Sequence, residues 1–198
     1  MFYSDCLNVN ERGHLTIGGC DTVQLAEMFG TPLYVMDETA IRRALRAYKA
    51  SIDENYENGG MVTYASKACC FKELYRIVGQ EGCGADVVSG GEIYTALQAG
   101  FPAERLYFHG NNKSGEELRL ALEAGVGRIV ADNPLELEQL SAAACSMGKT
   151  AAVYLRITPG INAHTHDFIR TGQIDSKFGF TLETGEALEG VRRAPTLP

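Results

Sequence analysis

The feature that most constrains the fold of this chain is a regular alternation of short apolar segments with longer amphipathic ones between residues 61 and 157. The apolar segments have the length of buried strands and fall at residues 61–65, 85–88, 106–108, 128–131 and 151–157. Helical patterns separate them, at residues 71–79, 91–99, from Ser114 onward and at 134–147. Because strands that alternate with helices form parallel sheets, this spacing predicts an α/β fold, as a barrel or an open parallel sheet.

A barrel is favoured over an open sheet because residues suited to chemistry follow the carboxyl ends of several successive strands. A closed eight-stranded barrel usually needs about 250 residues, whereas we count only about five strand–helix units. We therefore expect residues 41–198 to be the amino-terminal part of a β/α barrel, inactive alone, with an exposed sheet edge prone to association. Residues 1–40 have the pattern of short strands and turns, and we assign them to a β domain completed further along the chain.

The charge balance argues against nucleic acid or an anionic membrane as a partner, because 25 acidic and 18 basic residues give a formal charge of −7. No apolar run approaches the ~20 residues of a membrane span, and the first residues show no signal-peptide pattern. We therefore expect a cytoplasmic protein. The 6 cysteines include no C-x-x-C pair, which predicts buried free thiols and no metal site.

Lys67 is the main candidate for chemistry. It follows the predicted strand 61–65, at the end of a parallel strand where α/β folds place their reactive groups. We expect an apolar wall behind it, which makes the ammonium form costly and the amine more nucleophilic, as a Schiff-base lysine requires. The alternative is a lysine that merely ends a strand.

Three further strand ends carry candidates. Ser89-Gly90-Gly91-Glu92 follows the second strand, where a tight turn with Glu92 serving the helix dipole is the structural alternative. A polar loop with His109, Asn111 and Lys113 follows the third strand. Arg156, at the end of the fifth strand, is expected to meet an acidic residue or an anionic ligand, because an unpaired charge there would be costly.

Two other polar segments are interpreted as structural. Asp132-Asn133-Pro134 has the pattern of a helix cap with proline in the first turn, so we assign it no catalytic role. His164-x-His166 with Asp167 is an incomplete ligand set for a metal ion, and we expect a loop there instead.

Tyr64-Ala65-Ser66-Lys67-Ala68, together with Ser176-Lys177-Phe178-Gly179, resembles motifs of the pyridoxal-phosphate-dependent decarboxylases built on the alanine-racemase-type (β/α)8 TIM barrel. The resemblance runs from about residue 30 to 190. It implies pyridoxal 5'-phosphate as the cofactor, attached to Lys67, and a homodimer with shared active sites. It implies cofactor-binding roles for Lys67, Asp86, Glu92, His109 and Arg156, and substrate or loop roles for Asn111, Lys113, His164 and Lys177.

The loop at 162–166, with Thr171-Gly172 and residues 175–180, is similar to one branch of this family in particular. That branch removes CO2 from meso-2,6-diaminopimelate to give L-lysine, the last step of lysine biosynthesis. Three alternatives remain open: a decarboxylase of the same fold for arginine, ornithine or carboxynorspermidine, a non-catalytic pyridoxal-phosphate-binding protein, and a scaffold without a cofactor.

Overall fold

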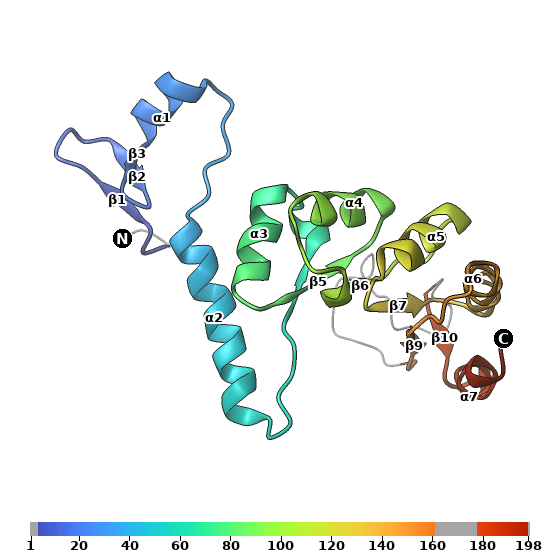
Figure 1. Ribbon diagram of the computed structural model, residues 1–198. Helices are drawn as coiled ribbons and strands as arrows, with labels where there is room; N and C mark the ends of the chain where they lie inside the picture. The colour runs from blue at the N-terminus through green and yellow to red at the C-terminus, as the bar shows by residue number, and fades with distance from the viewer. Residues whose placement is uncertain (1–3, 161–177, 198) are drawn as a thin grey trace. The chain divides into compact units, whose positions relative to one another are not determined.

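The computed structural model describes residues 4–160 and 178–197. By compactness the chain divides into two units, residues 1–62 and residues 63–198, which we call the N-terminal and C-terminal units and describe separately (Figure 1). The division expected at residue 40, with residues 1–40 belonging to a β domain, stays a prediction.

The N-terminal unit is a small antiparallel sheet followed by two helices. Its strands β1 (Leu7–Val9), β2 (Leu15–Ile17) and β3 (Cys20–Asp21) pair in the order β1-β2-β3. The helices are α1 (Thr22–Phe29) and α2 (Glu38–Asn55). Asp21 and Asp37 begin the two helices by accepting hydrogen bonds from backbone N–H groups of the first turn, as N-cap residues do.

The C-terminal unit contains a five-stranded parallel sheet whose strands lie in sequence order. These strands are β4 (Thr63–Ala65), β5 (Gly84–Val87), β6 (Leu106–Phe108), β7 (Arg128–Ala131) and β8 (Val153–Leu155). The intervening helices are α3 (Lys72–Gln80), α4 (Gly90–Gln98), α5 (Gly115–Ala124) and α6 (Pro134–Met147), which lie along one side of the sheet (Figure 1). The predicted alternation of five strands with helices is confirmed.

The helix starts follow from short polar residues after each strand. Ser89, Ser114 and Asn133 cap α4, α5 and α6, and Pro134 occupies the first turn of α6. Ser114 and Glu117 form a capping box, because Oε2 of Glu117 accepts the Ser114 N–H at 2.9 Å and Oγ of Ser114 accepts the Glu117 N–H at 3.2 Å. The other oxygen of Glu117 accepts the Gly90 N–H at 2.8 Å, which ties the start of α4 to the start of α5.

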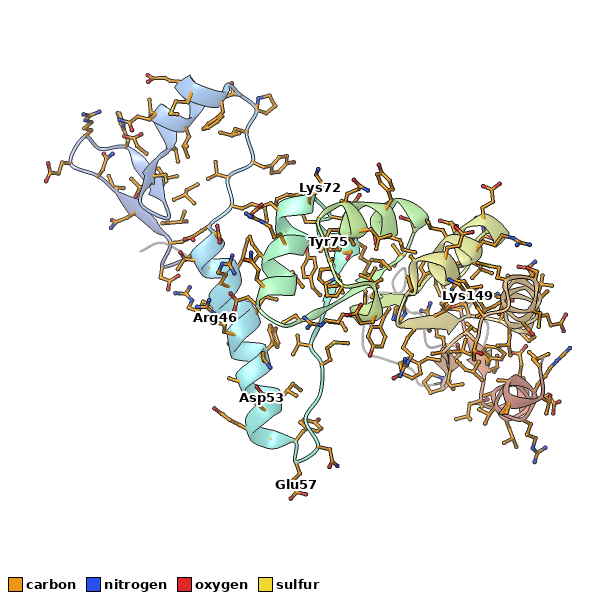
Figure 2. All side chains as sticks on the ribbon, in the orientation of Figure 1. Arg46, Asp53, Glu57, Lys72, Tyr75 and Lys149 are labelled. Atoms are coloured by element: carbon orange, nitrogen blue, oxygen red, sulfur yellow. The ribbon has the colours of Figure 1, made fainter. Side chains whose placement is uncertain are left out.

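The core lies between the sheet and these helices. Alternate strand residues face the helices and are buried, among them Ala85, Val87, Leu106, Phe108, Ile129 and Ala131. Tyr75 of α3, labelled in Figure 2, is 1% exposed, and its ring packs against that of Phe101 in a T-shaped arrangement, with the centroids 5.9 Å apart. Desolvation raises its pKa to about 12. Burying each large apolar side chain contributes about 1.5–3 kcal/mol to stability.

The opposite face of the sheet carries polar and aromatic residues. Ala65, Asp86, Tyr107 and Arg128 are successive register partners across β4 to β7, so their side chains share this face. The rings of Tyr107 and Tyr154 are 6.0 Å apart, and Arg128 lies 5.7 Å from the Tyr154 ring. This face therefore differs from the helix-facing side of the sheet, which is apolar.

The last predicted strand, residues 151–157, is interrupted. β8 ends at Leu155, and after Arg156 a separate strand β9 (Ile157–Thr158) pairs in parallel with β10 (Phe180–Thr181). The single-strand prediction is wrong because residues 157–158 leave the main sheet to pair with β10. Phe180 packs with Ala131, Leu137 and Ala187, the last from helix α7 (Glu186–Arg193).

Gly179 allows this pairing. Its φ of +77° suits glycine, and a Cβ there would lie 2.7 Å from the Arg156 carbonyl oxygen and 2.8 Å from Thr158 Oγ1. The Phe180 N–H donates to that same carbonyl at 2.7 Å. The approach of β10 to β9 therefore requires a residue without a side chain at position 179.

All six cysteines are free thiols; Cys83 is buried and Cys6 and Cys69 are partly buried, so the expectation of buried thiols is wrong for the three exposed ones. Cys20, Cys70 and Cys145 are exposed. Across residues 4–160 and 178–197, no helix has both the length and the apolar character needed to cross a lipid bilayer.

Candidate functional site

A pocket of about 420 Å³ lies at the carboxyl ends of the parallel strands. It is lined by Lys67 after β4, Asp86 of β5, His109 and Asn111 after β6, and Arg156 after β8. We call this the rim pocket. Its size falls within the range of about 300–1,000 Å³ that is usual for small-molecule sites. The structure thus brings five sequence-predicted residues together from separate parts of the chain.

Lys67 sits in a short 3-10 turn, η1 (Ser66–Ala68), directly after β4. The hydroxyl of Tyr64 donates to the Cys69 carbonyl oxygen at 2.9 Å, which closes this turn on itself. The Lys67 side chain is exposed and lines the rim pocket. Because this side chain is exposed, the expected desolvation of Lys67 against an apolar wall is not found. What the turn supplies is an accessible amine.

Asp86 and His109 come from neighbouring strands and meet in the rim pocket. Oδ1 of Asp86 lies 3.4 Å from Nε2 of His109, and both side chains are partly exposed. The His109 N–H donates to the Val87 carbonyl oxygen at 2.8 Å, which extends the β5–β6 pairing to the site. A carboxylate this close to an imidazole can orient the ring.

Arg156 forms an ion pair with an acidic residue, Asp132. Its Nη1 lies 3.0 Å from Oδ1 of Asp132, whose side chain is 2% exposed, and its guanidinium carbon lies 4.5 Å from the Phe178 ring centroid. The expectation of an acidic partner for Arg156 is confirmed. Asp132 and Phe178 were missed as site residues, although a charged residue directly after the buried strand β7 was a signal for Asp132.

Glu92 lies in the turn between β5 and α4 and is not among the residues that line the rim pocket. Its carboxylate is buried and accepts the Val88 N–H at 2.8 Å. It is fixed by the first turn of α4, whose cap Ser89 accepts the Glu92 N–H. This geometry supports the structural alternative for Glu92, and its proposed contact with a cofactor stays a prediction.

Lys113 is also placed away from the rim pocket. Its Nζ donates to the carbonyl oxygens of Gly110 at 2.6 Å and Val130 at 2.8 Å, and it lies 2.7 Å from Oε1 of Glu136. Burial raises the pKa of Glu136, and the bond from Lys113 opposes that effect. Lys113 therefore holds the loop that carries His109 and Asn111, instead of presenting its amine to a ligand.

His164 and Lys177, the remaining loop candidates, lie outside the described residues. Within the described ranges, no group of three or more His, Cys, Asp or Glu side chains is arranged to hold a metal ion.

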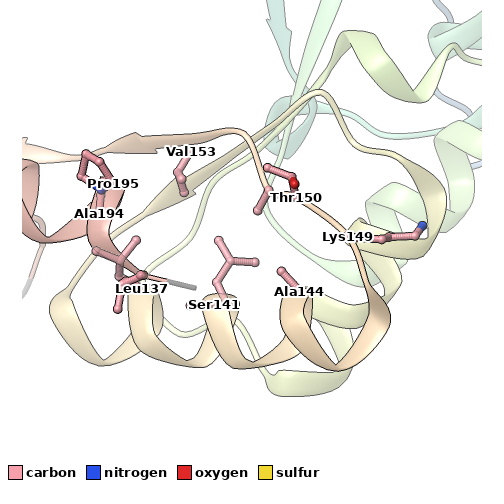
Figure 3. Close-up of a pocket in the computed structure, with 11 residues that line it drawn as sticks. Leu137, Ser141, Ala144, Lys149, Thr150, Val153, Ala194 and Pro195 are labelled. Carbon is pink, nitrogen blue, oxygen red and sulfur yellow. The ribbon is translucent and has the colours of Figure 1, made fainter.

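A second pocket, of about 370 Å³, lies between α6, the residues before β8 and the segment after α7. Figure 3 shows Leu137, Ala144, Val153 and Pro195 among its lining residues. Lys149 also lines this pocket, and its Nζ donates hydrogen bonds to the carbonyl oxygens of Leu122 and Glu123. This pocket offers little chemistry compared with the rim pocket.

The residues of the rim pocket fit pyridoxal phosphate. An aldehyde needs an accessible amine, which Lys67 supplies, and anionic oxygens need a fixed hydrogen-bond donor, which Arg156 supplies. Asp86 and His109 add a carboxylate and an imidazole on the same side of the pocket. The donor set therefore matches an aromatic aldehyde that carries negative charge.

Comparison with known families gives the same assignment. Residues 38–197 match the family described as pyridoxal-dependent decarboxylase, pyridoxal binding domain. Diaminopimelate decarboxylase of Bacillus methanolicus is 48% identical over 194 residues, which are 98% of this chain and 45% of that protein. The enzyme of the same name from Bacillus subtilis is 48% identical over 196 residues, covering 98% of this chain and 44% of that protein.

Solved structures agree. Diaminopimelate decarboxylase from M. jannaschii in complex with L-lysine has a TM-score of 0.88 and 35% identity, covering 100% of this chain and 46% of that one. The Helicobacter pylori enzyme complexed with L-lysine has a TM-score of 0.76 and 30% identity, covering 88% of this chain and 44% of that one. This chain thus spans a little under half the length of the relatives it matches.

Proposed function

This chain belongs to the pyridoxal-dependent decarboxylases, whose pyridoxal-binding domain it carries, and we propose that it is the cofactor-holding part of a diaminopimelate decarboxylase. The five-stranded sheet is part of the alanine-racemase-like barrel of this family. The observation that carries the proposal is the meeting of Lys67, Asp86, His109 and Arg156 in one pocket.

The proposed reaction removes one carboxylate of meso-2,6-diaminopimelate and yields L-lysine and CO2, the last step of lysine biosynthesis. Two observations support this substrate over other amino acids. The curated relatives at 48% identity share one name, diaminopimelate decarboxylase. Two similar structures of that name were solved with L-lysine, the product of this reaction.

Pyridoxal phosphate, when bound, supplies an aromatic ring that takes up the electrons left behind when CO2 departs. The residues of this chain prepare the pocket for that chemistry. Nζ of Lys67 is the attachment point, and once free it can carry a proton to or from the reacting carbon. Arg156 donates hydrogen bonds in a direction set by Asp132 and Phe178. Asp86 orients Nε2 of His109.

The resemblance to these enzymes also leads us to propose a cytoplasmic protein that works as a homodimer. A dimer in which each subunit contributes to the other's site would complete a pocket that is open in this chain. Size-exclusion chromatography with light scattering tests the oligomeric state. A monomer that retains full activity would contradict the shared site.

Release of carboxyl-labelled CO2 tests the substrate. The protein expressed from the gene that encodes this chain is incubated with labelled diaminopimelate, ornithine, arginine or carboxynorspermidine. We expect CO2 from diaminopimelate in preference to the others, and none from any of them with Lys67→Ala. Lys72→Ala, an exposed lysine at the start of α3, is the matched control and should keep the activity. Preferential release from ornithine or arginine would contradict the assignment.

A further inference from the structure

We infer that Asp132 is a positioning residue of the rim pocket, whose carboxylate aims the guanidinium of Arg156 and docks residues 178–179 beside it. The inference rests on the proposed function, because it concerns how the pocket holds an anionic cofactor. It concerns a residue that the sequence pattern assigned only to a helix cap.

The two oxygens of Asp132 have different partners. Oδ1 accepts from Nη1 of Arg156 at 3.0 Å, and Oδ2 accepts the Gly179 N–H at 3.3 Å. The side chain is 2% exposed. A carboxylate buried this deeply needs such partners, since an unpaired charge in the interior is costly. Asp132 therefore fixes two segments that are distant from it in sequence.

Arg156 is constrained from two directions. Asp132 holds one terminal nitrogen, and the Phe178 ring lies 4.5 Å from the guanidinium carbon. A guanidinium has five N–H donors in a rigid plane, so fixing that plane also fixes the direction of the remaining donors. Arg156 is 33% exposed and lines the rim pocket. A donor that is already oriented loses less freedom when a ligand binds.

A substitution at Thr158 can distinguish the two roles of Asp132, which are orienting Arg156 and docking residues 178–179. Oγ1 of Thr158 donates to the Phe178 carbonyl oxygen, so Thr158 also helps to dock residues 178–179. No described hydrogen bond joins the Thr158 side chain to Arg156. Thr158→Val, which keeps the shape of the side chain, therefore disturbs the docking while leaving the Asp132–Arg156 pair in place.

Asp132 also balances charge. Without its carboxylate, the positive charge of Arg156 would act on the pocket uncompensated. Added positive charge disfavours the protonated form of any amine adduct in the same pocket. The loss of Asp132 is therefore expected to move the pH midpoint of a covalent cofactor adduct to lower pH, which a purely structural role would not do.

The test loads the protein with pyridoxal 5'-phosphate and measures the dissociation constant and the pH midpoint of the adduct's absorbance. Asp132→Asn and Arg156→Lys should each weaken binding by about ten- to hundredfold, the usual range for a hydrogen bond to a charged group. The double variant should lose little more than one single variant, because both act through the same guanidinium. Asp132→Asn should also lower the midpoint, and Thr158→Val should leave it unchanged.

Unchanged affinity and midpoint in Asp132→Asn, with the adduct still on Lys67, would overturn the inference. If Asp132→Asn does not fold, Arg156→Lys carries the test, and wild-type affinity in that variant would overturn it. If the unmodified protein forms no adduct, the proposed function fails instead. In that case, NMR measures how freely the Arg156 guanidinium rotates. Rotation that is hindered in the unmodified protein and in Thr158→Val, but free in Asp132→Asn, supports the inference. Equal rotation rates in these three proteins would overturn it.

Discussion

Nζ of Lys113 lies 2.7 Å from Oε1 of Glu136, and the two side chains are 1% and 4% exposed. The same amine reaches the carbonyl oxygens of Gly110 and Val130. This buried pair joins α6 to the loop that places His109 and Asn111 in the rim pocket. The buried Lys113–Glu136 pair thus holds in place the loop that forms one side of the rim pocket.

Breaking this pair should be costly. Glu136→Gln leaves the Lys113 charge buried without its partner, which is expected to lower the free energy of unfolding by about 3–5 kcal/mol. Glu138→Gln is the matched control, because Glu138 lies on the same helix and pairs with Arg193 at 45% exposure. Exposed pairs contribute about 0–1 kcal/mol. Urea denaturation measures both variants.

The double variant Lys113→Met with Glu136→Leu distinguishes charge from packing. It removes both charges at similar volume, and we expect it to be more stable than Glu136→Gln. Equal losses in Glu136→Gln and Glu138→Gln would show that the buried pair does not stabilise the fold in this way.

Gly179→Ala is expected to destabilise the pairing of β9 with β10. The positive φ alone costs about 1–3 kcal/mol for a residue with a side chain, and the new Cβ would also press against the Arg156 carbonyl oxygen. Gly115→Ala is the control, because Gly115 lies in the first turn of α5 with no atom near its Cβ position. Urea midpoints compare the two, and a Gly179→Ala protein as stable as the control would contradict the account.

Acid should weaken the N-terminal unit through Asp21. Although desolvation opposes it, the hydrogen bonds from His14, Asn10, Gln24 and Val23 lower the pKa of Asp21 from 3.8 to about 2. Because the folded pKa lies below the ordinary value, ionised Asp21 stabilises the fold above about pH 4, and this contribution is lost as the pH falls toward 2.

NMR titration of the Asp21 carboxyl carbon measures this pKa directly. We expect a midpoint near 2 in the unmodified protein and a higher one in His14→Ala, which removes a hydrogen-bond donor. A midpoint near 3.8 in the unmodified protein would contradict the role of these hydrogen bonds.

Local signals explain which parts of the fold the sequence could predict. The bounds of α6 were correct because Pro134 and Gly148 mark its two ends, and β6 and β7 are short apolar runs between polar residues. β10 was missed because a two-residue strand depends on the approach of Gly179 to Arg156, which no local pattern encodes. The strand predicted from residue 61 begins at Thr63.

The site shows the same limit. Lys67 and Asp86 could be placed because each lies at or after the end of a recognisable strand, and parallel strands bring their carboxyl ends to one edge. Lys113 sits in an equally polar loop, but its amine points into the interior because it pairs with Glu136 and donates hydrogen bonds to two carbonyl oxygens there. The direction in which such a side chain points depends on partners that are distant in sequence, and so does the role of Asp132.

The central claim is that the amine of Lys67 carries the cofactor, and reductive trapping tests it most directly. The protein is incubated with pyridoxal 5'-phosphate, reduced with borohydride, digested and mapped by mass spectrometry, beside Lys67→Arg and Lys72→Arg. The account predicts the label on the peptide that contains Lys67 in the unmodified and Lys72→Arg proteins, and no label there in Lys67→Arg. A label on any other lysine, or none on the intact protein, would contradict it.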